Sequence, residues 1–174
     1  MLKLIDELDF KISNFIFKNI KNKKLDFILG KINRGEFFFL IFLFVCYNQG
    51  QSWKEFGTLC AHLAIVTTFS EKFTLYIKRK IKRVRPGNRV MGKQDPNPDM
   101  NNSFPSAHSA NSMTAISLMV FIYSFSPYLF WFSFFAGLAR LLTLHHYLSD
   151  VISGWLFGFF LGVLNYIVYI QFFQ

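Results

Sequence analysis

Residues 151–173 read VISGWLFGFFLGVLNYIVYIQFF, an apolar stretch that exceeds the roughly 20 residues a helix needs to cross a bilayer. Glycine recurs in it every four residues, at Gly154, Gly158 and Gly162. This spacing places the three glycines on one helix face, where the backbone of a second helix can approach closely. The stretch therefore predicts a membrane-spanning helix that packs tightly against a neighbour.

Four more apolar segments precede this stretch along the chain, at residues 37–47, 57–69, 109–125 and 128–144. The first two are short for a spanning helix, and the second is expected to continue as a helix to about Arg83. Hydrophobic residues make up 52% of the chain, more than a soluble domain of this size needs. We expect an all-α, multi-pass transmembrane bundle of about five spans over residues 36–174.

The first 35 residues are more polar and form a separate segment. Apolar and charged residues alternate there at helical spacing, and neither of two helical stretches is apolar enough to span a bilayer. We expect two amphipathic helices that lie in the membrane interface. Acidic residues near the start exclude the apolar region of a cleavable signal peptide. The apolar face expected for the first helix comprises Leu4, Leu8, Ile12, Phe15 and Ile16.

Basic residues outnumber acidic ones by 19 to 10, and they are clustered. Eight precede Glu36 and eight lie between Lys78 and Lys93. Because both clusters flank apolar segments and lack interleaved aromatic residues, they indicate anionic lipid headgroups as partners rather than nucleic acid. Cys46 and Cys60 lie in apolar segments without metal-ligand spacing, so we expect them to fill space in the core.

The second basic cluster contains Lys78 and, seven residues later, Arg85. If one helix runs through both, they share a face, and Pro86 ends the helix next to Arg85. Two cations at a helix end suit a doubly charged phosphate. The alternative is a basic run that reaches the headgroups without a binding role. In the long polar loop 87–104 that follows, two prolines argue against a helix, and a loop of this length is often functional.

A second group of polar residues, Pro105-Ser106-Ala107-His108, precedes the third apolar segment. Ser103 or Ser106 is a candidate N-cap, and the free amides of a helix N-terminus attract an anion. His108 has a reference pKa near neutrality, which makes it a candidate proton donor to a departing alkoxide. An ordinary helix cap with an interfacial histidine is the alternative.

Arg140, His146 and Asp150 form the third group. An arginine within an apolar span is costly and indicates a functional site. On a helix His146 and Asp150 would adjoin, and a carboxylate bound to one imidazole nitrogen leaves the other free to attack phosphorus. A structural His–Asp pair that caps the fifth helix is the alternative. Five crossings would put all three groups on one side of the membrane, where they supply a nucleophile, an acid and three cations for phosphoryl transfer.

Together the three groups resemble the motifs of the type 2 phosphatidic acid phosphatase superfamily. The family patterns are Lys-x6-Arg-Pro, Pro-Ser-Gly-His and Ser-Arg-x5-His-x3-Asp, and the chain matches them in order and spacing over residues 78–150. Two positions depart: Ala107 stands in place of the usual glycine and Ala139 in place of the usual serine. Neither departure removes an atom needed for nucleophilic attack, so we expect at most a modest loss of rate.

The resemblance implies an all-helical lipid phosphatase that uses no metal and no cofactor. By this resemblance His146 attacks phosphorus, Asp150 orients the imidazole, and His108 protonates the leaving oxygen. The residues expected to hold the phosphate are Lys78, Arg85, Ser106 and Arg140.

The expected substrate is a phosphate monoester of a membrane lipid, lipid A 1-phosphate or phosphatidylglycerophosphate. Undecaprenyl diphosphate is an alternative substrate, and a membrane protein that binds phosphate-bearing lipids without turnover is an alternative class. Vanadium-dependent haloperoxidases share the fold, but they are larger and soluble. By analogy we expect a multi-pass protein of the inner membrane with its site towards the periplasm, although the positive-inside rule favours the cytoplasmic face. The sequence leaves the oligomeric state open.

Overall fold

The structure is a computed structural model that describes residues 2–32, 35–49, 52–92 and 95–173. Every regular element in these ranges is helical, as the sequence predicts, and one isolated backbone bridge joins Val84 and Asn102. The elements are α1 Leu2–Asn19, α2 Lys23–Ile32, α3 Gly35–Asn48, α4 Trp53–Ile81, α5 Pro86–Met91, α6 Pro98–Asn101, α7 Ala107–Phe121, the 3-10 turn η1 Pro127–Leu129, α8 Phe130–Leu142 and α9 Leu148–Phe173.

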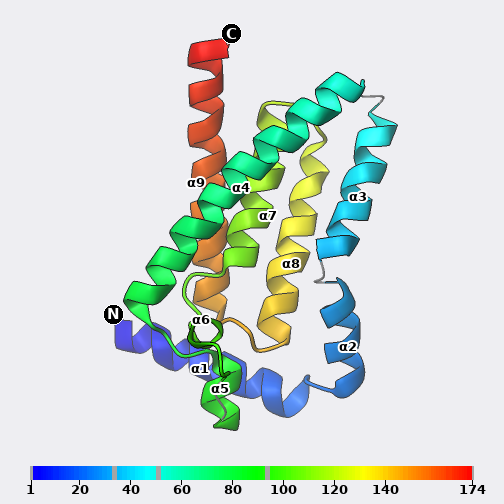
Figure 1. The fold of residues 1–174 in the computed structure, drawn as a ribbon. Coiled ribbons are helices and arrows are strands. Elements are labelled where there is room, and N and C mark those ends of the chain that lie inside the picture. Colours follow the sequence, from blue (N-terminus) through cyan, green and yellow to red (C-terminus); the bar gives the residue numbers. More distant parts are fainter. Residues whose placement is uncertain (1, 33–34, 50–51, 93–94, 174) are drawn as a thin grey trace.

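Helix α7 forms the centre of the bundle (Figure 1). Its most extensive contact is with α9, and α4 and α8 also pack against it. Helices α2 and α3 follow one another along the side of the bundle next to α8. Helix α1 lies across the lower end, where α5, α6 and the loop from α8 to α9 also gather. Segments from the beginning, middle and end of the chain therefore meet at this end.

The contact between α7 and α9 is close because α9 presents glycines to α7. A Cβ atom built on Gly158 would lie 2.3 Å from the carbonyl oxygen of Ala110, and one on Gly154 would lie 2.5 Å from that of Ser106. A Cβ on Gly162 would meet a side chain of α7 just as closely. Since only glycine permits this approach, the packing face predicted from the glycine spacing is confirmed.

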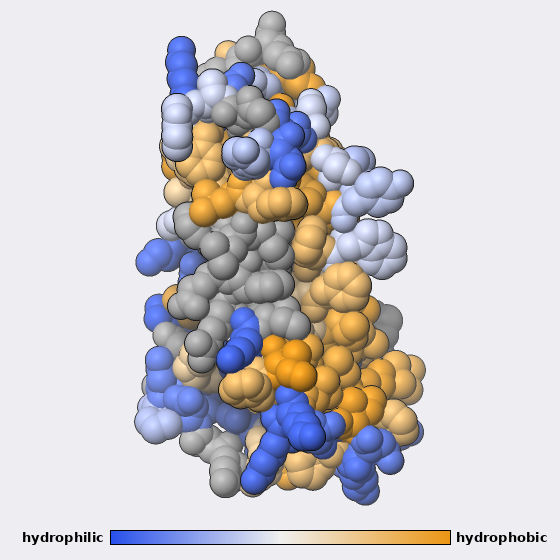
Figure 2. Space-filling view, turned by 90° about the vertical axis from the view of Figure 1, so that its right-hand side faces the viewer, coloured by the Kyte–Doolittle hydropathy of each residue, from blue (hydrophilic) through white to orange (hydrophobic). Residues whose placement is uncertain are grey.

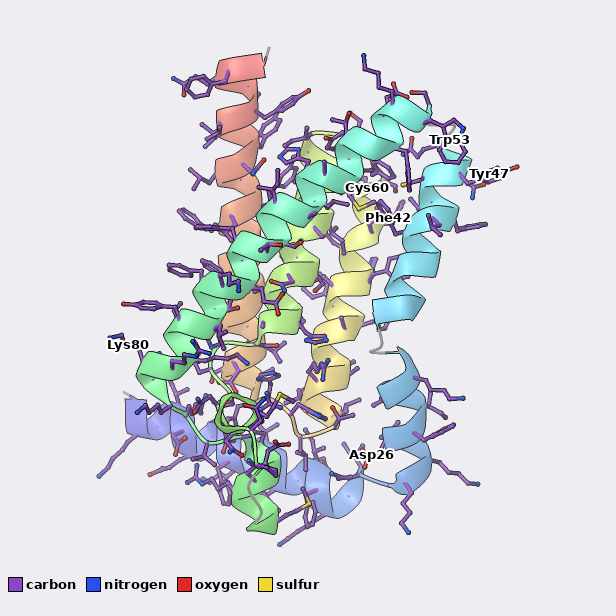
Figure 3. The ribbon with its side chains drawn as sticks, in the orientation of Figure 1. Asp26, Phe42, Tyr47, Trp53, Cys60 and Lys80 are labelled. Atoms are coloured by element: carbon purple, nitrogen blue, oxygen red, sulfur yellow. The ribbon has the colours of Figure 1, made fainter. Side chains whose placement is uncertain are left out.

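An apolar core lies between α3, α4 and α7. Cys46 is 4% exposed within it and packs with Leu59 and Leu118, which are fully buried. Figure 3 shows Cys60 and Phe42 between the upper parts of α4 and α3. Both cysteines are free thiols, and Cys60 is half-buried. They fill space, as expected.

Helix α9 is the only one in the described ranges that is both long and apolar enough to cross a membrane, over Leu148–Phe172. Helix α8 with its preceding turn is apolar but short, and the 15 residues of α7 extend about 22 Å. Helix α4 has 29 residues but carries charged residues towards both ends. The expected total of five spans therefore stays a prediction.

Hydrophilic side chains gather at the lower end of the molecule, among hydrophobic ones (Figure 2). In the same view, hydrophobic side chains cover much of the coloured surface above them. Lys80 and Asp26 lie towards this end in Figure 3, whereas Tyr47 and Trp53 lie at the opposite end. Tyr47 is 84% and Trp53 is 89% exposed. Exposed aromatic residues of this kind are typical of a membrane–water interface.

The N-terminal segment forms α1 and α2, so helices occupy both predicted places. Only part of the predicted apolar face of α1 is buried, however. Ile16 is buried against the loop end of α8, whereas Leu8 and Phe15 are more than half exposed. The side of α1 that faces the bundle also buries two polar residues, Asp9 and Ser13. The location of these helices in the membrane interface stays a prediction.

The connection from α4 to α7 differs from the prediction in two respects. Helix α4 ends at Ile81, earlier than predicted, because Lys82 adopts a left-handed conformation with φ of 52°. The segment 87–104, expected to lack helix, contains α6 and most of α5. Each of these short helices begins with a proline, Pro86 or Pro98, and a proline at the first helical position loses no hydrogen bond.

Replacing Gly158 by alanine is expected to push α7 and α9 apart. Overpacking of this kind costs about 1–3 kcal/mol, so the variant should unfold at a lower temperature, measured by circular dichroism in detergent. Gly57→Ala is the matched control, because a Cβ there has nothing within 4 Å and alanine favours a helix by about 1 kcal/mol. Equal melting temperatures for Gly158→Ala and the unchanged protein would contradict the close contact.

Candidate active site

Stretches far apart in the sequence meet at the lower end of the bundle through backbone hydrogen bonds. The amides of Ser103 and Ser106 donate to the carbonyl oxygens of Arg83 and Asp150, at 2.7 and 3.0 Å. A third bond of this kind joins the start of α5 to the loop between α8 and α9. Ser103 and Ser106 are fully buried. The three groups of polar residues found in the sequence therefore form one connected layer.

Lys78 and Arg85 come together, but not along one helix as predicted. Lys78 lies in the last turn of α4, and Arg85 is the N-cap residue of α5 after the chain has turned. Both side chains approach the carbonyl oxygen of Asn102, Lys78 Nζ at 3.5 Å and Arg85 Nε at 3.3 Å. The helical explanation is wrong because α4 ends before Arg85, and the loop brings the two cations together instead.

Ser106 is the N-cap residue of α7, one of the two predicted options. Its hydroxyl accepts a hydrogen bond from the backbone N–H of Ser109 at 3.4 Å and one from the Ser109 hydroxyl at 2.9 Å. Ala107 is the first helical residue and does not have a positive φ. The alanine therefore meets no conformational strain at this position, although the related motif has glycine there.

His108 and Arg140 contact each other directly. Arg140 Nη2 donates to His108 Nε2, since a guanidinium has donors only. In this arrangement the neutral imidazole of His108 carries its proton on Nδ1. Arg140 Nε is buried and has no hydrogen-bond partner in the described part of the chain. A buried donor of this kind is available to an anion.

His146 and Asp150 are neighbours, but they do not form the predicted hydrogen bond. His146 Nδ1 lies 3.8 Å from Asp150 Oδ2, which is too long for a hydrogen bond. His146 precedes the first turn of α9, which starts at Leu148, so helical geometry does not bring the pair together. Asp150 Oδ2 accepts from the Tyr147 amide at 2.8 Å instead. The carboxylate therefore orients the loop that carries His146.

Arg83 is a central residue of the site that the sequence analysis missed. Its Nη1 donates to Asp150 Oδ1 at 2.7 Å, and its Nη2 donates to Asp9 Oδ2 at 2.8 Å. Its guanidinium carbon lies 4.1 Å from the centre of the Tyr147 ring. In the sequence, Arg83 is one of eight clustered basic residues, and Asp9 is one of three acidic residues near the start of the chain. Nothing in either local pattern connects α1 to α9.

Burial strongly lowers the pKa of the two histidines in the loop between α8 and α9. It lowers the pKa of His146 from its usual 6.5 to about 4, and the positive charges of Lys78 and Arg85 act in the same direction, against the effect of Asp150. The pKa of His145 also falls to about 4, through burial and through Arg140 and Arg85. Both imidazoles are therefore neutral near pH 7, and a neutral imidazole has the lone pair that a nucleophile needs.

The fold and the site define a helical protein with a layer of cationic and histidine side chains at one end of its bundle. The sequence pattern of the PAP2 superfamily matches residues 55–173. The chain belongs to the PAP2 superfamily.

One similar solved structure is the crystal structure of a transmembrane PAP2 type phosphatidylglycerolphosphate phosphatase from Bacillus subtilis. The TM-score is 0.69 at 18% sequence identity, and the alignment covers 98% of this chain and 90% of that one. At this identity the likeness concerns the fold, including α1 to α3, which precede the matched family region. No curated protein matches the sequence.

The low pKa of His146 can be tested by NMR on the detergent-solubilised protein with isotope-labelled histidine. The His146 ring signals should show a midpoint of about 4, whereas an unperturbed histidine titrates near 6.5. The sign follows from burial, which penalises the charged imidazolium. His146→Gln assigns the signal. A His146 midpoint at or above 6.5 would contradict the neutral nucleophile.

Proposed function

We propose that the chain is an integral-membrane lipid phosphatase that hydrolyses a phosphate monoester through a phosphohistidine intermediate. The observation that carries this proposal is the surroundings of His146. The imidazole is buried, neutral near pH 7, adjacent to Asp150, and under the influence of two cations, Lys78 and Arg85. A nucleophile beside groups that can hold an anion is what phosphoryl transfer requires.

In the first step, phosphate oxygens of the lipid bind Lys78, Arg85 and Arg140, together with Ser106 and the amides at the start of α7. The neutral imidazole of His146 attacks phosphorus, and the bond from phosphorus to the lipid oxygen breaks. His108 donates a proton to this leaving oxygen. For that transfer Arg140 turns from His108 Nε2 to the phosphate, and the freed Nε2 takes up a proton from solvent as the substrate binds, so that His108 is an imidazolium before it donates.

In the second step, a water molecule attacks phosphorus of the phosphohistidine. His108, now neutral, accepts a proton from the water, and the bond between phosphorus and His146 breaks. Inorganic phosphate leaves and His146 is restored. Asp150 stabilises the positive charge that His146 gains in the first step and loses when its bond to phosphorus breaks. No redox change occurs, and every proton is returned.

For the substrate we propose phosphatidylglycerophosphate or lipid A 1-phosphate. The first is the substrate named for the Bacillus subtilis phosphatase of similar fold, but a similar fold does not exclude the second. Undecaprenyl diphosphate is the alternative. The exposed aromatic residues at the upper end of the bundle and the basic residues at the lower end favour a multi-pass arrangement with one end at each membrane surface. We place the site towards the periplasm, on the analogy alone.

His146→Ala should abolish turnover. Phosphate release by the purified full chain is measured on phosphatidylglycerophosphate, lipid A, phosphatidic acid and undecaprenyl diphosphate in mixed micelles. Removal of the nucleophile should lower kcat on the order of 10³-fold or more on the preferred lipid. His145→Gln is the matched control, since it changes the adjacent imidazole and should retain most activity. Wild-type turnover by His146→Ala would disprove the mechanism.

Turnover should be unaffected by a chelator, because histidine rather than a metal-bound water attacks phosphorus. The same assay is run with millimolar EDTA, and then with vanadate, which adopts the trigonal-bipyramidal geometry of the transition state. Vanadate should inhibit at submillimolar levels, since transition-state analogues bind much more tightly than substrates. Loss of activity with EDTA that added Mg²⁺ restores would contradict the metal-free mechanism.

A further inference from the structure

Helix α1 has no part in the mechanism described so far, yet it lies directly across the end of the bundle that carries the site (Figure 1). It also precedes the region of the chain that matches the superfamily, which starts at residue 55. Its inward side carries Asp9, which is 3% exposed although it is charged. A buried carboxylate is costly unless it is paired, so its partners indicate what it does.

Asp9 binds two elements of the site at once. Its Oδ2 accepts from Arg83 Nη2 at 2.8 Å and from the Ser149 hydroxyl, and its Oδ1 accepts from the Ser149 amide at 3.1 Å. Ser149 lies in the first turn of α9, where backbone N–H groups have no partner within the helix. Asp9 therefore caps α9 from another helix, one residue before Asp150.

Arg83 extends this contact to Asp150. Its planar guanidinium donates from Nη1 to Asp150 Oδ1 at 2.7 Å and to the Ser149 hydroxyl at 2.7 Å, while Nη2 is turned to Asp9. Stacking over the Tyr147 ring holds the plane of the group. One cation thus lies between two buried carboxylates, and the three charges together retain a net charge of minus one beside His146.

We infer that Asp9 is a positioning residue, which holds Asp150 in place and preserves its negative charge by sharing Arg83 with it. The inference rests on the proposed function, in which Asp150 stabilises the positive charge on His146. Without the carboxylate of Asp9, Arg83 is balanced by Asp150 and by the more exposed Asp6, and Asp150 supports His146 less. Asp6 also reaches Arg83, at 3.2 Å, but its side chain is 45% exposed and it pairs with Arg89 as well. Solvent screens Asp6, so its contribution is smaller.

Asp9→Asn tests this directly, since it removes the charge and keeps the shape. Phosphate release by the full chain in mixed micelles should show kcat lowered on the order of ten- to a hundredfold with KM nearly unchanged. Asp9→Glu, which keeps the charge, should recover a large part of kcat. Glu7→Gln is the matched control, because it removes an exposed carboxylate from the same helix and should leave both constants unchanged. Asp6→Asn should have an effect between those of Glu7→Gln and Asp9→Asn.

Arg83→Lys is the second variant, and it decides the matter if Asp9→Asn fails to fold, as judged by its melting temperature. An ammonium keeps the charge but lacks the fork that reaches both carboxylates, so kcat should again fall at nearly constant KM. Wild-type kcat in either folded variant, or a loss confined to KM, would overturn the inference. His146→Ala assayed in parallel separates the two proposals. If His146→Ala is inactive, wild-type kcat in Asp9→Asn or Arg83→Lys rejects only the positioning role of Asp9. If His146→Ala is active, the phosphatase mechanism itself is rejected.

Discussion

The close approach of α7 and α9 is the constraint on which the rest of the structure depends. Glycines at 154 and 158 let the backbone of α9 come within contact of carbonyl oxygens on α7. At the lower end of the same contact, the Ser106 amide donates to the carbonyl oxygen of Asp150. The start of α7, which is the proposed anion site, therefore lies beside the start of α9, which carries the proposed charge partner of the nucleophile. A wider helix spacing would separate the two halves of the site.

The cations at this end of the bundle differ in the groups that they contact. Arg83 is balanced by Asp9 and Asp150, so it orders the site and has little capacity left for a ligand. Lys78 and Arg85 both approach the carbonyl oxygen of Asn102, and their positive charge lowers the pKa of His146. Arginines and lysines that look equivalent in a basic run thus take two roles: Arg83 binds carboxylates of α1 and α9, whereas Lys78 and Arg85 act on His146.

The sequence predicted the helical class, the tight face of α9, a cap of α7 at Ser103 or Ser106 and the three groups of polar residues, because each rests on local spacing. It failed where the backbone departs from regular helix. Because α4 ends early at a left-handed Lys82, Lys78 and Arg85 do not share a helix face as predicted. Because α9 starts at Leu148, His146 and Asp150 are not neighbours on one helix, as had also been predicted. Two helices that begin with proline in the polar loop were missed because proline is unfavourable only after the first turn.

The sequence alone determined the period of each helix, the apolar length of α9 and the chemical types available for a phosphate site, since these are properties of neighbouring residues. Only the tertiary structure decided that the N-terminal helix caps α9 and that Arg83 joins Asp9 to Asp150. Those contacts link residues separated by 74 and 140 positions along the chain. Their existence depends on how α1 packs across the bundle, and a buried ion pair of this kind leaves no periodic signal in either partner segment.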